Sequence, residues 1–203
     1  MDIVSLVVGS LATNCYLLTS GNDCVIIDPG SEADFISTTI LENRLNPLAI
    51  LLTHGHFDHC LAALELKLNF NLPIFVHKDD SFLYRTADKS ANHWTGEKAL
   101  KLPPPDHNLI DGQELEFNDL KLKVIHTPGH TPGSVCLLTD SALFTGDLLF
   151  AEGVGRTDFS YSDHKKLLFS LKKIRGLPDT LLVYPGHEEF GLPLYQILSG
   201  HLL

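Results

Sequence analysis

The sequence predicts an α/β protein, a four-layer αββα sandwich of two mixed β-sheets flanked by helices. Two successive blocks of the chain each contain several strand-like segments followed by a helix-like segment. Short polar turns join neighbouring strands within each block, and parallel strands cannot be connected by turns of about two to four residues. The hairpins therefore disfavour the alternative arrangement, a doubly wound parallel sheet. The 203 residues are expected to form a single domain, 1–203.

The first block is predicted to be mainly β-structure, because apolar and β-branched runs alternate with turn residues. Continuous apolar character over residues 48–52 is typical of a strand buried on both faces. Ser31, which follows the Pro29-Gly30 turn, is expected to cap a helix over residues 32–44. The predicted elements are an N-terminal strand, strands at 14–19, 24–28, 48–52 and 74–76, and helices at 32–44 and 61–68.

The second block repeats this pattern, with the polar pairs Asn118-Asp119 and Asp140-Ser141 predicted to close two hairpins. Between the blocks, the polar segment 87–108 contains three consecutive prolines and is predicted to be a long loop. Long loops in compact domains often bind substrate or act as lids. The predicted elements of the second block are strands at 114–117, 120–126, 134–139, 142–145 and 181–184, and a helix at 164–174.

The composition argues against several classes of function. Acidic residues outnumber basic ones by 25 to 15, and the formal net charge of −10 disfavours a nucleic-acid partner, which requires a basic face. No apolar run approaches the roughly 18 residues needed to cross a membrane, and the N-terminus lacks the positive region of a signal peptide. The four cysteines form no C-x-x-C pair, so reduced thiols and a cytoplasmic location are expected. We expect a small-molecule substrate and a monomer or small homo-oligomer.

The clearest chemical signal is the segment Thr53-His54-Gly55-His56-Phe57-Asp58-His59, which follows the buried strand at 48–52 directly. It places three histidines and one aspartate at a strand end. Imidazole nitrogens and carboxylate oxygens are ordinary ligands of Zn²⁺, and they also suit iron and manganese. In an irregular loop, alternate side chains can point toward different ions. This segment therefore predicts a metal site.

Three more candidate ligands occupy similar places in the sequence. His130, Asp147 and His187 each follow a predicted strand and each stands beside a glycine, where the backbone can turn sharply. One catalytic zinc needs about three protein ligands and an open position, so seven candidates are too many for one ion. Two ions about 3.5–4 Å apart, sharing the Asp147 carboxylate, would use them all. We expect two divalent cations, with Zn favoured over Fe or Mn.

These residues resemble the motifs of the metallo-β-lactamase-fold superfamily. Within it, the chain is similar to the short, single-domain relatives of type II glyoxalase, the hydroxyacylglutathione hydrolases. The resemblance extends from the first strands to Glu188. The motifs that carry it are Asp28-Pro29-Gly30, the segment Thr53 to His59, Thr127-Pro128-Gly129-His130-Thr131-Pro132-Gly133, Thr145-Gly146-Asp147 and Gly153-Val154-Gly155-Arg156-Thr157-Asp158-Phe159.

The resemblance implies the same αββα sandwich and a division of the ligands between two metals. All seven ligand positions of the family match residues of this sequence. It implies that the first metal is bound by His54, His56 and His130, the second by Asp58, His59 and His187, and that Asp147 bridges both.

The resemblance is weaker for substrate binding. Type II glyoxalases carry a lysine nine residues after the bridging aspartate, and Arg156 stands there with the same charge, so it is expected to bind a substrate carboxylate. Two family tyrosines that contact glutathione fall at Asp158 and Glu189, and neither is a tyrosine. The larger relatives add a C-terminal helical domain, which is not expected here. Glutathione specificity is therefore an open question.

The leading functional hypothesis is hydrolysis of a thioester such as S-lactoylglutathione to a 2-hydroxy acid and a thiol. A hydroxide bridging the two metals would attack, and Asp58 would orient it as the catalytic residue. One alternative is a persulfide dioxygenase with a single iron. A second is another hydrolase of the superfamily, acting on a lactam, lactone or phosphoester, although β-lactamases commonly carry a cysteine at the position of Asp147. His93-Trp94 is a candidate pocket contact.

Overall fold

The computed structural model describes residues 1–200, which contain two six-stranded sheets. The first sheet has the order β1-β2-β3-β4-β5-β6. β1, β2 and β3 pair antiparallel and β3 to β6 pair parallel, so the sheet is mixed. Its strands are β1 (Asp2–Val8), β2 (Thr13–Ser20), β3 (Asp23–Ile27), β4 (Asn46–Leu51), β5 (Ile74–His77) and β6 (His107–Leu109).

The second sheet has the order β12-β11-β10-β9-β8-β7 and is also mixed, because β10 and β11 are parallel while the other neighbours are antiparallel. The predicted hairpin at Asn118-Asp119 is confirmed, since Phe117 pairs with Leu120 across it. Its strands are β7 (Glu114–Phe117), β8 (Leu120–His126), β9 (Val135–Leu138), β10 (Ala142–Gly146), β11 (Leu182–Pro185) and β12 (Leu192–Pro193).

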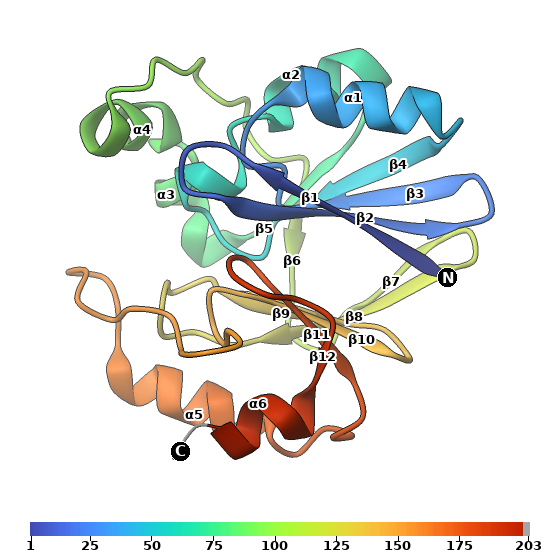
Figure 1. The fold of residues 1–203 in the computed structure, drawn as a ribbon. Helices are drawn as coiled ribbons and strands as arrows, with labels where there is room; N and C mark the ends of the chain where they lie inside the picture. The colour runs from blue at the N-terminus through green and yellow to red at the C-terminus, as the bar shows by residue number, and fades with distance from the viewer. Residues whose placement is uncertain (201–203) are drawn as a thin grey trace.

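Helices cover the outer faces of both sheets, so the predicted αββα sandwich is confirmed (Figure 1). α1 (Ala33–Glu42) and α2 (Ala63–Phe70) pack on the first sheet through residues such as Ile36 and Leu66. α5 (His164–Ile174) and α6 (Leu194–Gly200) pack on the second through residues such as Leu171. Within residues 1–200, no helix has the length and apolar character needed to cross a bilayer.

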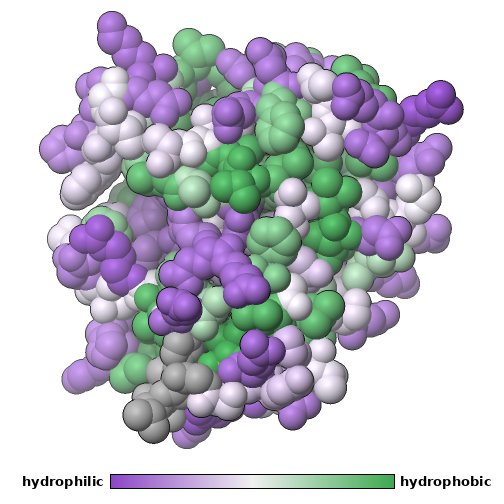
Figure 2. Space-filling view, in the orientation of Figure 1, coloured by the Kyte–Doolittle hydropathy of each residue, from purple (hydrophilic) through white to green (hydrophobic). Residues whose placement is uncertain are grey.

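The core between the two sheets explains the continuous apolar strands. In β3, Val25 and Ile27 face the second sheet, whereas Ile26 faces the helical layer of α1 and α2. All three are fully buried, and burying one such side chain contributes about 1.5–3 kcal/mol. In the same orientation, Figure 2 shows apolar side chains over much of the middle of the visible face, with a group of polar side chains among them and further polar side chains around the margins.

Two local predictions are wrong. Ser31 does not cap α1: the helix begins at Ala33, after Glu32 in a left-handed conformation with φ 56°, and no side chain caps it. The Glu32 carboxylate instead accepts a hydrogen bond from the Gly9 N–H at 2.9 Å, which ties the helix start to the β1–β2 loop.

The segment 87–108 is not one long loop, because it contains α4 (Ala87–Thr95) and β6 (His107–Leu109). α4 buries only the small side chains of Ala87 and Ala91, so its apolar stripe is too weak to stand out in the sequence. α4 follows a compact turn region made of η2 (Lys78–Asp80) and α3 (Ser81–Tyr84). Together these elements form one wall beside the strand ends that carry the candidate ligands (Figure 1).

Candidate metal centre

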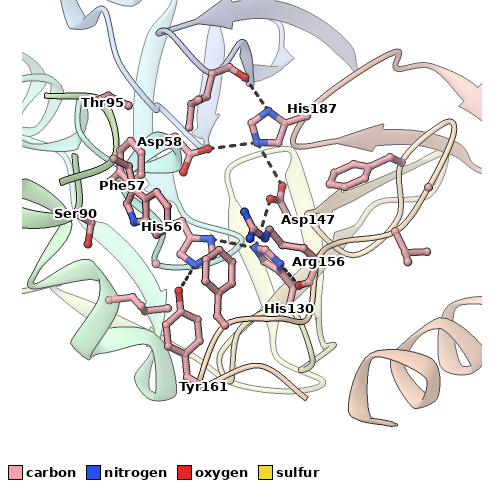
Figure 3. A pocket seen from close by; sticks show the side chains of 18 of the residues that line it. His56, Phe57, Asp58, Ser90, Thr95, His130, Asp147, Arg156, Tyr161 and His187 are labelled. Atoms are coloured by element: carbon pink, nitrogen blue, oxygen red, sulfur yellow. Dashed lines mark hydrogen bonds and ion pairs between the residues drawn. The ribbon is translucent and has the colours of Figure 1, made fainter. Parts of the chain in front are cut away.

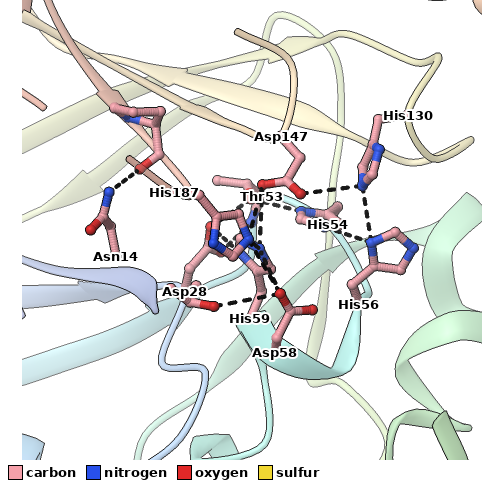
Figure 4. A network of polar contacts seen from close by, with 12 residues as sticks. Asn14, Asp28, Thr53, His54, His56, Asp58, His59, His130, Asp147 and His187 are labelled. Carbon is pink, nitrogen blue, oxygen red and sulfur yellow. Dashed lines mark hydrogen bonds and ion pairs between the residues drawn. The ribbon is translucent and has the colours of Figure 1, made fainter. Parts of the chain in front are cut away.

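The seven candidate ligands come together at one rim of the sandwich, where four strands of the two sheets end (Figure 4). β4 leads into the segment Thr53 to His59, part of which forms η1 (Phe57–His59). His130 lies in the loop between β8 and β9, Asp147 directly follows β10, and His187 follows β11. The order of the strands within each sheet thus brings together side chains that are more than a hundred residues apart in sequence.

One group consists of His54, His56, His130 and Asp147, whose ligand atoms all lie within 4.8 Å of one another. His54 Nε2 and His130 Nε2 each lie 3.0 Å from His56 Nδ1. Asp147 Oδ2 lies 3.4 Å from His130 Nε2. Three imidazole nitrogens and one carboxylate oxygen therefore face a common centre, which is the donor set of a metal site.

A second group consists of Asp58, His59 and His187. His187 Nε2 lies 3.3 Å from both His59 Nε2 and Asp58 Oδ2. The other oxygen of Asp147, Oδ1, lies 3.4 Å from His59 Nε2 and 3.8 Å from His187 Nε2. The two oxygens of Asp147 thus face different groups, as a bridging carboxylate requires.

Each of the five histidines is held by an oxygen on the side of its ring that points away from the centre. Such contacts fix the tautomer and ring orientation of metal-binding histidines and leave the inward nitrogen free to donate its lone pair. The pairs are His54 Nδ1 with Thr53 Oγ1 (3.1 Å), His56 Nε2 with Tyr161 Oη (2.9 Å), His59 Nδ1 with Asp28 Oδ2 (3.0 Å), His130 Nδ1 with the Arg156 carbonyl (2.8 Å) and His187 Nδ1 with the Leu11 carbonyl (3.1 Å).

The inward-facing atoms fit cations better than they fit one another. Burial lowers the pKa of His54 well below its usual value and that of His56 to about 3, so both rings are neutral at pH 7 and their facing nitrogens have no proton to share. Asp147 Oδ1 is buried and accepts no hydrogen bond from the described residues. Close lone pairs and a buried carboxylate oxygen without a hydrogen bond are the features that a bound divalent cation would satisfy.

His59 is the exception among the buried rings. Burial by itself lowers its pKa, but Asp147, Asp58 and Asp28 surround it and raise the pKa above 6.5. The pKa of His187 is also raised, because Asp58 and Asp147 outweigh the effect of burial. Without a cation, a proton on these rings offsets the negative charge of the carboxylates, so protons and metal compete for this group.

This competition predicts opposite pH dependences for the metal-free and metal-loaded proteins. His59 and His187 bind protons more tightly when folded, so their stabilising contribution is complete below pH 6.5 and is lost as the pH rises through their raised pKa values. The free energy of unfolding of metal-free protein should therefore fall as the pH rises through the raised pKa values of His59 and His187, by at most about 1.4 kcal/mol per group and pH unit. His54 and His56 oppose this change near pH 6.5, where they still bind protons in the unfolded chain, but above about pH 7.5 they are neutral in both states.

Thermal melts of chelator-treated and zinc-loaded protein test this expectation. The gain in Tm on zinc loading should increase with pH, because the metal binds deprotonated ligands. A gain that shrinks with rising pH would contradict the proposed competition.

Asp28, part of the first motif, orients the ligand loop. Its Oδ1 accepts from the Thr53 N–H at 2.7 Å, and its Oδ2 accepts from Thr53 Oγ1 at 2.6 Å and contacts His59 Nδ1. Although Asp28 groups with His54 and His59 by distance, its oxygens are already engaged by these donors. It therefore acts on the metal centre through Thr53 and His59.

Asp80 is a residue of the site that sequence reasoning missed. It is fully buried at the end of η2 and connects the two loops that carry the first ligand group. Its Oδ2 accepts from the Gly55 N–H (2.9 Å) and Thr131 Oγ1 (2.6 Å), and its Oδ1 accepts from the Gly133 N–H (2.6 Å). One carboxylate thus fixes the spacing between the His54–His56 loop and the His130 loop.

Asp80→Asn is expected to lower the free energy of unfolding by about 2 kcal/mol, because the amide NH₂ faces a donor and one buried hydrogen bond is lost. The variant should also release metal at lower chelator concentrations than wild type, since both ligand loops depend on Asp80. Asp79→Asn, at an exposed neighbouring carboxylate, is the matched control. Chelator titration followed by metal analysis makes the comparison, and wild-type retention in Asp80→Asn would contradict this role.

His77, Asp79 and His126 form another group by distance, but their geometry does not suit a metal. The rings of His77 and His126 stack with centroids 4.2 Å apart and planes inclined by 12°, so their in-plane lone pairs do not converge. His126 Nε2 also donates to the Pro132 carbonyl, and His77 Nδ1 accepts from the Asp79 N–H. This stacked pair packs β5 against β8.

A cavity of about 590 Å³ opens beside the ligands (Figure 3). Ser90, Trp94 and Thr95 of α4 line it, so the segment predicted as a long loop contributes to the pocket as a helix. Trp94, a candidate pocket contact from the sequence, is among them. Arg156 also lines the cavity, but its Nε and Nη2 donate to the two oxygens of Asp158 at 2.7 and 2.6 Å.

Comparison with known proteins identifies relatives of matching length. The chain is 38% identical over 184 residues to the probable metallo-hydrolase YqgX of Bacillus subtilis, a match covering 89% of this chain and 87% of the relative. It is 33% identical over 195 residues to the hydroxyacylglutathione hydrolase GloC of Haemophilus influenzae, covering 94% and 92%.

Two solved structures superpose closely on the fold. TTHA1623 in a di-iron-bound form has a TM-score of 0.91 at 38% identity, with 98% of each chain covered. The B3 metallo-β-lactamase BLEG-1 also has a TM-score of 0.91, at 34% identity, with 98% of this chain and 97% of that chain covered. The family model of the metallo-β-lactamase superfamily matches residues 8–187, a span that includes every candidate ligand. On its fold, its rim of histidines and aspartates and this match, the chain belongs to the metallo-β-lactamase superfamily of metallo-hydrolases.

Proposed function

We propose that this protein is a dinuclear metal-dependent hydrolase that cleaves thioesters of 2-hydroxy acids, with S-lactoylglutathione as the first substrate to assay. The observation that carries the proposal is the arrangement of seven inward-facing side chains, in which Asp147 presents one oxygen to each of two groups. A single-metal enzyme has no need of the second complete group, Asp58, His59 and His187.

In this proposal, His54, His56 and His130 would hold one cation, Asp58, His59 and His187 would hold the other, and Asp147 would contribute to both groups. Zn²⁺ suits this nitrogen and oxygen set, as do iron and manganese. When bound, two such cations supply a water that is deprotonated near neutral pH and a positive charge that stabilises a developing oxyanion. Asp58 belongs to the second group and also lines the cavity, so it is placed to orient the attacking water.

The reaction needs few other groups. The oxygen of water adds to the thioester carbonyl carbon, the C–S bond breaks, and the departing thiolate takes up the proton, giving a carboxylic acid and a thiol. A thiolate is a good leaving group, so no strong general acid is required. Tyr161 accepts a hydrogen bond from His56 Nε2 and lines the cavity. Burial raises its pKa to about 12, so its own O–H remains available to a bound substrate.

We propose further that the protein acts on a small molecule in the cytoplasm, as a monomer or small homo-oligomer, and other features support the first two points. The cavity has the size of a small-molecule site. All four cysteines are buried and none forms a disulfide, as is usual in a reducing compartment. The relative from Haemophilus influenzae carries the name of a hydroxyacylglutathione hydrolase.

The test is a steady-state assay of metal-loaded protein with S-lactoylglutathione, in which a thiol reagent follows product release and metal analysis counts the ions. We expect turnover that disappears with a chelator, returns with zinc and is absent from His54→Ala. Turnover no greater than that of His54→Ala, in protein containing two ions per chain, would rule out this thioester as a substrate.

The same preparation tests the alternatives. A β-lactam belongs in the panel because BLEG-1, at 34% identity, is described as a B3 metallo-β-lactamase. Oxygen uptake with glutathione persulfide, in protein that contains one iron per chain, would replace the hydrolase proposal with a dioxygenase. Lactone and phosphoester substrates complete the panel.

A further inference from the structure

Apart from the candidate ligands, the wall of the cavity is mainly apolar. Its large hydrophobic side chains come from five different parts of the chain, the β1–β2 loop, η1, α3, α4 and the segment after β10. They are Leu11, Phe57, Leu83, Trp94, Phe150, Val154 and Phe159. Pockets of this size and lining bind mostly through apolar contact, with a few polar groups fixing orientation. The candidate ligands supply those polar groups, so the apolar wall is left for the remainder of the substrate.

Arg156 is the only lysine or arginine among the described residues that line the cavity, and its guanidinium is already paired with Asp158. Both oxygens of Asp158 accept from its guanidinium, and the guanidinium carbon lies 4.5 Å from the centre of the Phe159 ring. Phe159 in turn stacks on Tyr161 with ring centroids 5.3 Å apart. Arg156, Phe159 and Tyr161 therefore form a continuous stack whose one positive charge is paired with Asp158.

By contrast, no ion pair among the described residues neutralises the negative charge of Glu188 at the rim of the cavity. Glu188 lines the cavity, and its carboxylate accepts only from the Glu152 backbone N–H at 3.2 Å among the contacts the described residues provide. Exposed ion pairs are individually weak, and the Arg156–Asp158 pair is exposed. Asp158 is nevertheless two residues from Arg156, so a substrate carboxylate competes with a partner held at high local concentration.

We propose that the preferred substrate is a thioester whose thiol part carries no negative charge and is largely apolar, and that Asp158 sets this preference by occupying Arg156. This inference rests on the proposed thioester hydrolysis and narrows its substrate class. Glutathione carries two carboxylates, and this wall offers them no free cation. An uncharged thiol part instead places its hydrocarbon against Trp94, Phe57 and Phe159.

The first experiment compares kcat/KM for three thioesters of lactate. S-Lactoylglutathione and its diethyl ester differ in the two negative charges and in the two ethyl groups that replace them, and the thioester with phenylmethanethiol has an apolar leaving group. We expect wild type to prefer the diethyl ester over the free acid by about two- to fivefold, the strength of one exposed ion pair, mainly through KM. The benzyl thioester should be hydrolysed at least as well as the diethyl ester. Equal kcat/KM for the acid and the diester would overturn the proposal.

The second experiment assigns the preference to Asp158. Asp158→Ala frees Arg156 and should reduce the ratio of diester to acid by about two- to fivefold. Adding Arg156→Ala to this variant should restore the ratio. Glu188→Gln removes the same charge from the rim without freeing Arg156, and it should reduce the ratio less. An unchanged ratio in Asp158→Ala, or an equal reduction in both single variants, would contradict the role of Asp158.

Trp94 provides a binding measurement that does not depend on turnover. It is the single tryptophan of the sequence and lines the cavity, so its fluorescence reports occupancy. S-Benzylglutathione and its diethyl ester are thioethers that cannot be hydrolysed, and the diester should bind wild type about two- to fivefold more tightly. If no thioester is hydrolysed, the proposed function fails, whereas tighter binding of the charged thioether would overturn the present inference alone.

Discussion

Asp147→Asn is expected to reduce thioester turnover by about 10³-fold and to lower the metal content from two ions per chain to one or fewer. Among the side chains of the described residues, only Asp147 has an oxygen toward each ligand group, as the contacts of Oδ1 with His59 and of Oδ2 with His130 show. Asparagine has nearly the same shape but only one oxygen and no charge. It therefore cannot present a carboxylate oxygen to each of the two ligand groups.

The matched control is Asp140→Asn, the same chemical change at an exposed position in the β9–β10 hairpin. It should retain both metal content and turnover. Metal analysis and kinetics on the two variants, purified side by side, make the comparison. An Asp147→Asn enzyme with two tightly held ions would show that this carboxylate does not join the groups.

Gly155→Ala is expected to disrupt the candidate metal centre, although Gly155 is not one of the candidate ligands. A Cβ at Gly155 would overlap the backbone carbonyl oxygen of Asp147 and lie 3.3 Å from the Cβ of His130. The backbone of Asp147 cannot move away without displacing its side chain from the two groups. Overpacking of this kind costs about 1–3 kcal/mol, so we expect a lower Tm, weaker metal retention and at least about tenfold less turnover.

Gly153→Ala is the internal control for this prediction. The two glycines are two residues apart in the same segment, but a Cβ at Gly153 meets no heavy atom within 4 Å. The variant should match wild type in melting temperature, metal content and kinetics. If the two alanine variants had the same melting temperature, metal content and kinetics, the close approach of Gly155 to Asp147 would not explain why a glycine is needed there.

Much of the site could be predicted because its signals are local in sequence. The segment from Thr53 to His59 carries four candidate ligands directly after a buried strand, and the other three stand beside glycines after their own strands. The structure adds a reason for one such glycine: a Cβ at Gly186 would lie 2.6 Å from the His59 ring and would overlap Asp147 Oδ1. Such glycines permit close approach as well as sharp turns.

The residues that the sequence did not reveal act through contacts between distant segments. Asp80 is an ordinary acidic residue in a polar stretch until Gly55, Thr131 and Gly133 are seen to donate to it. Likewise, Arg156 keeps the charge that the resemblance leads one to expect, and only the structure shows Asp158 bound to it.

Local pattern also gave the wrong structure in two places where the chain departs from common rules. Ser31 has the residue type of a helix cap, but the left-handed Glu32 intervenes, and its carboxylate bonds to Gly9 in another loop. α4 is polar on most of its surface and buries only two alanines, so its composition is that of a loop. Both departures depend on tertiary contacts that no window of neighbouring residues contains.

The most direct test of the proposed metal centre is a crystal structure of zinc-loaded protein with anomalous scattering measured at the zinc absorption edge. Two anomalous peaks are expected, one contacting His54 Nε2, His56 Nδ1 and His130 Nε2, the other contacting Asp58, His59 Nε2 and His187 Nε2, with Asp147 touching both. A single peak, or peaks away from these side chains, would contradict the proposal that this rim holds two cations.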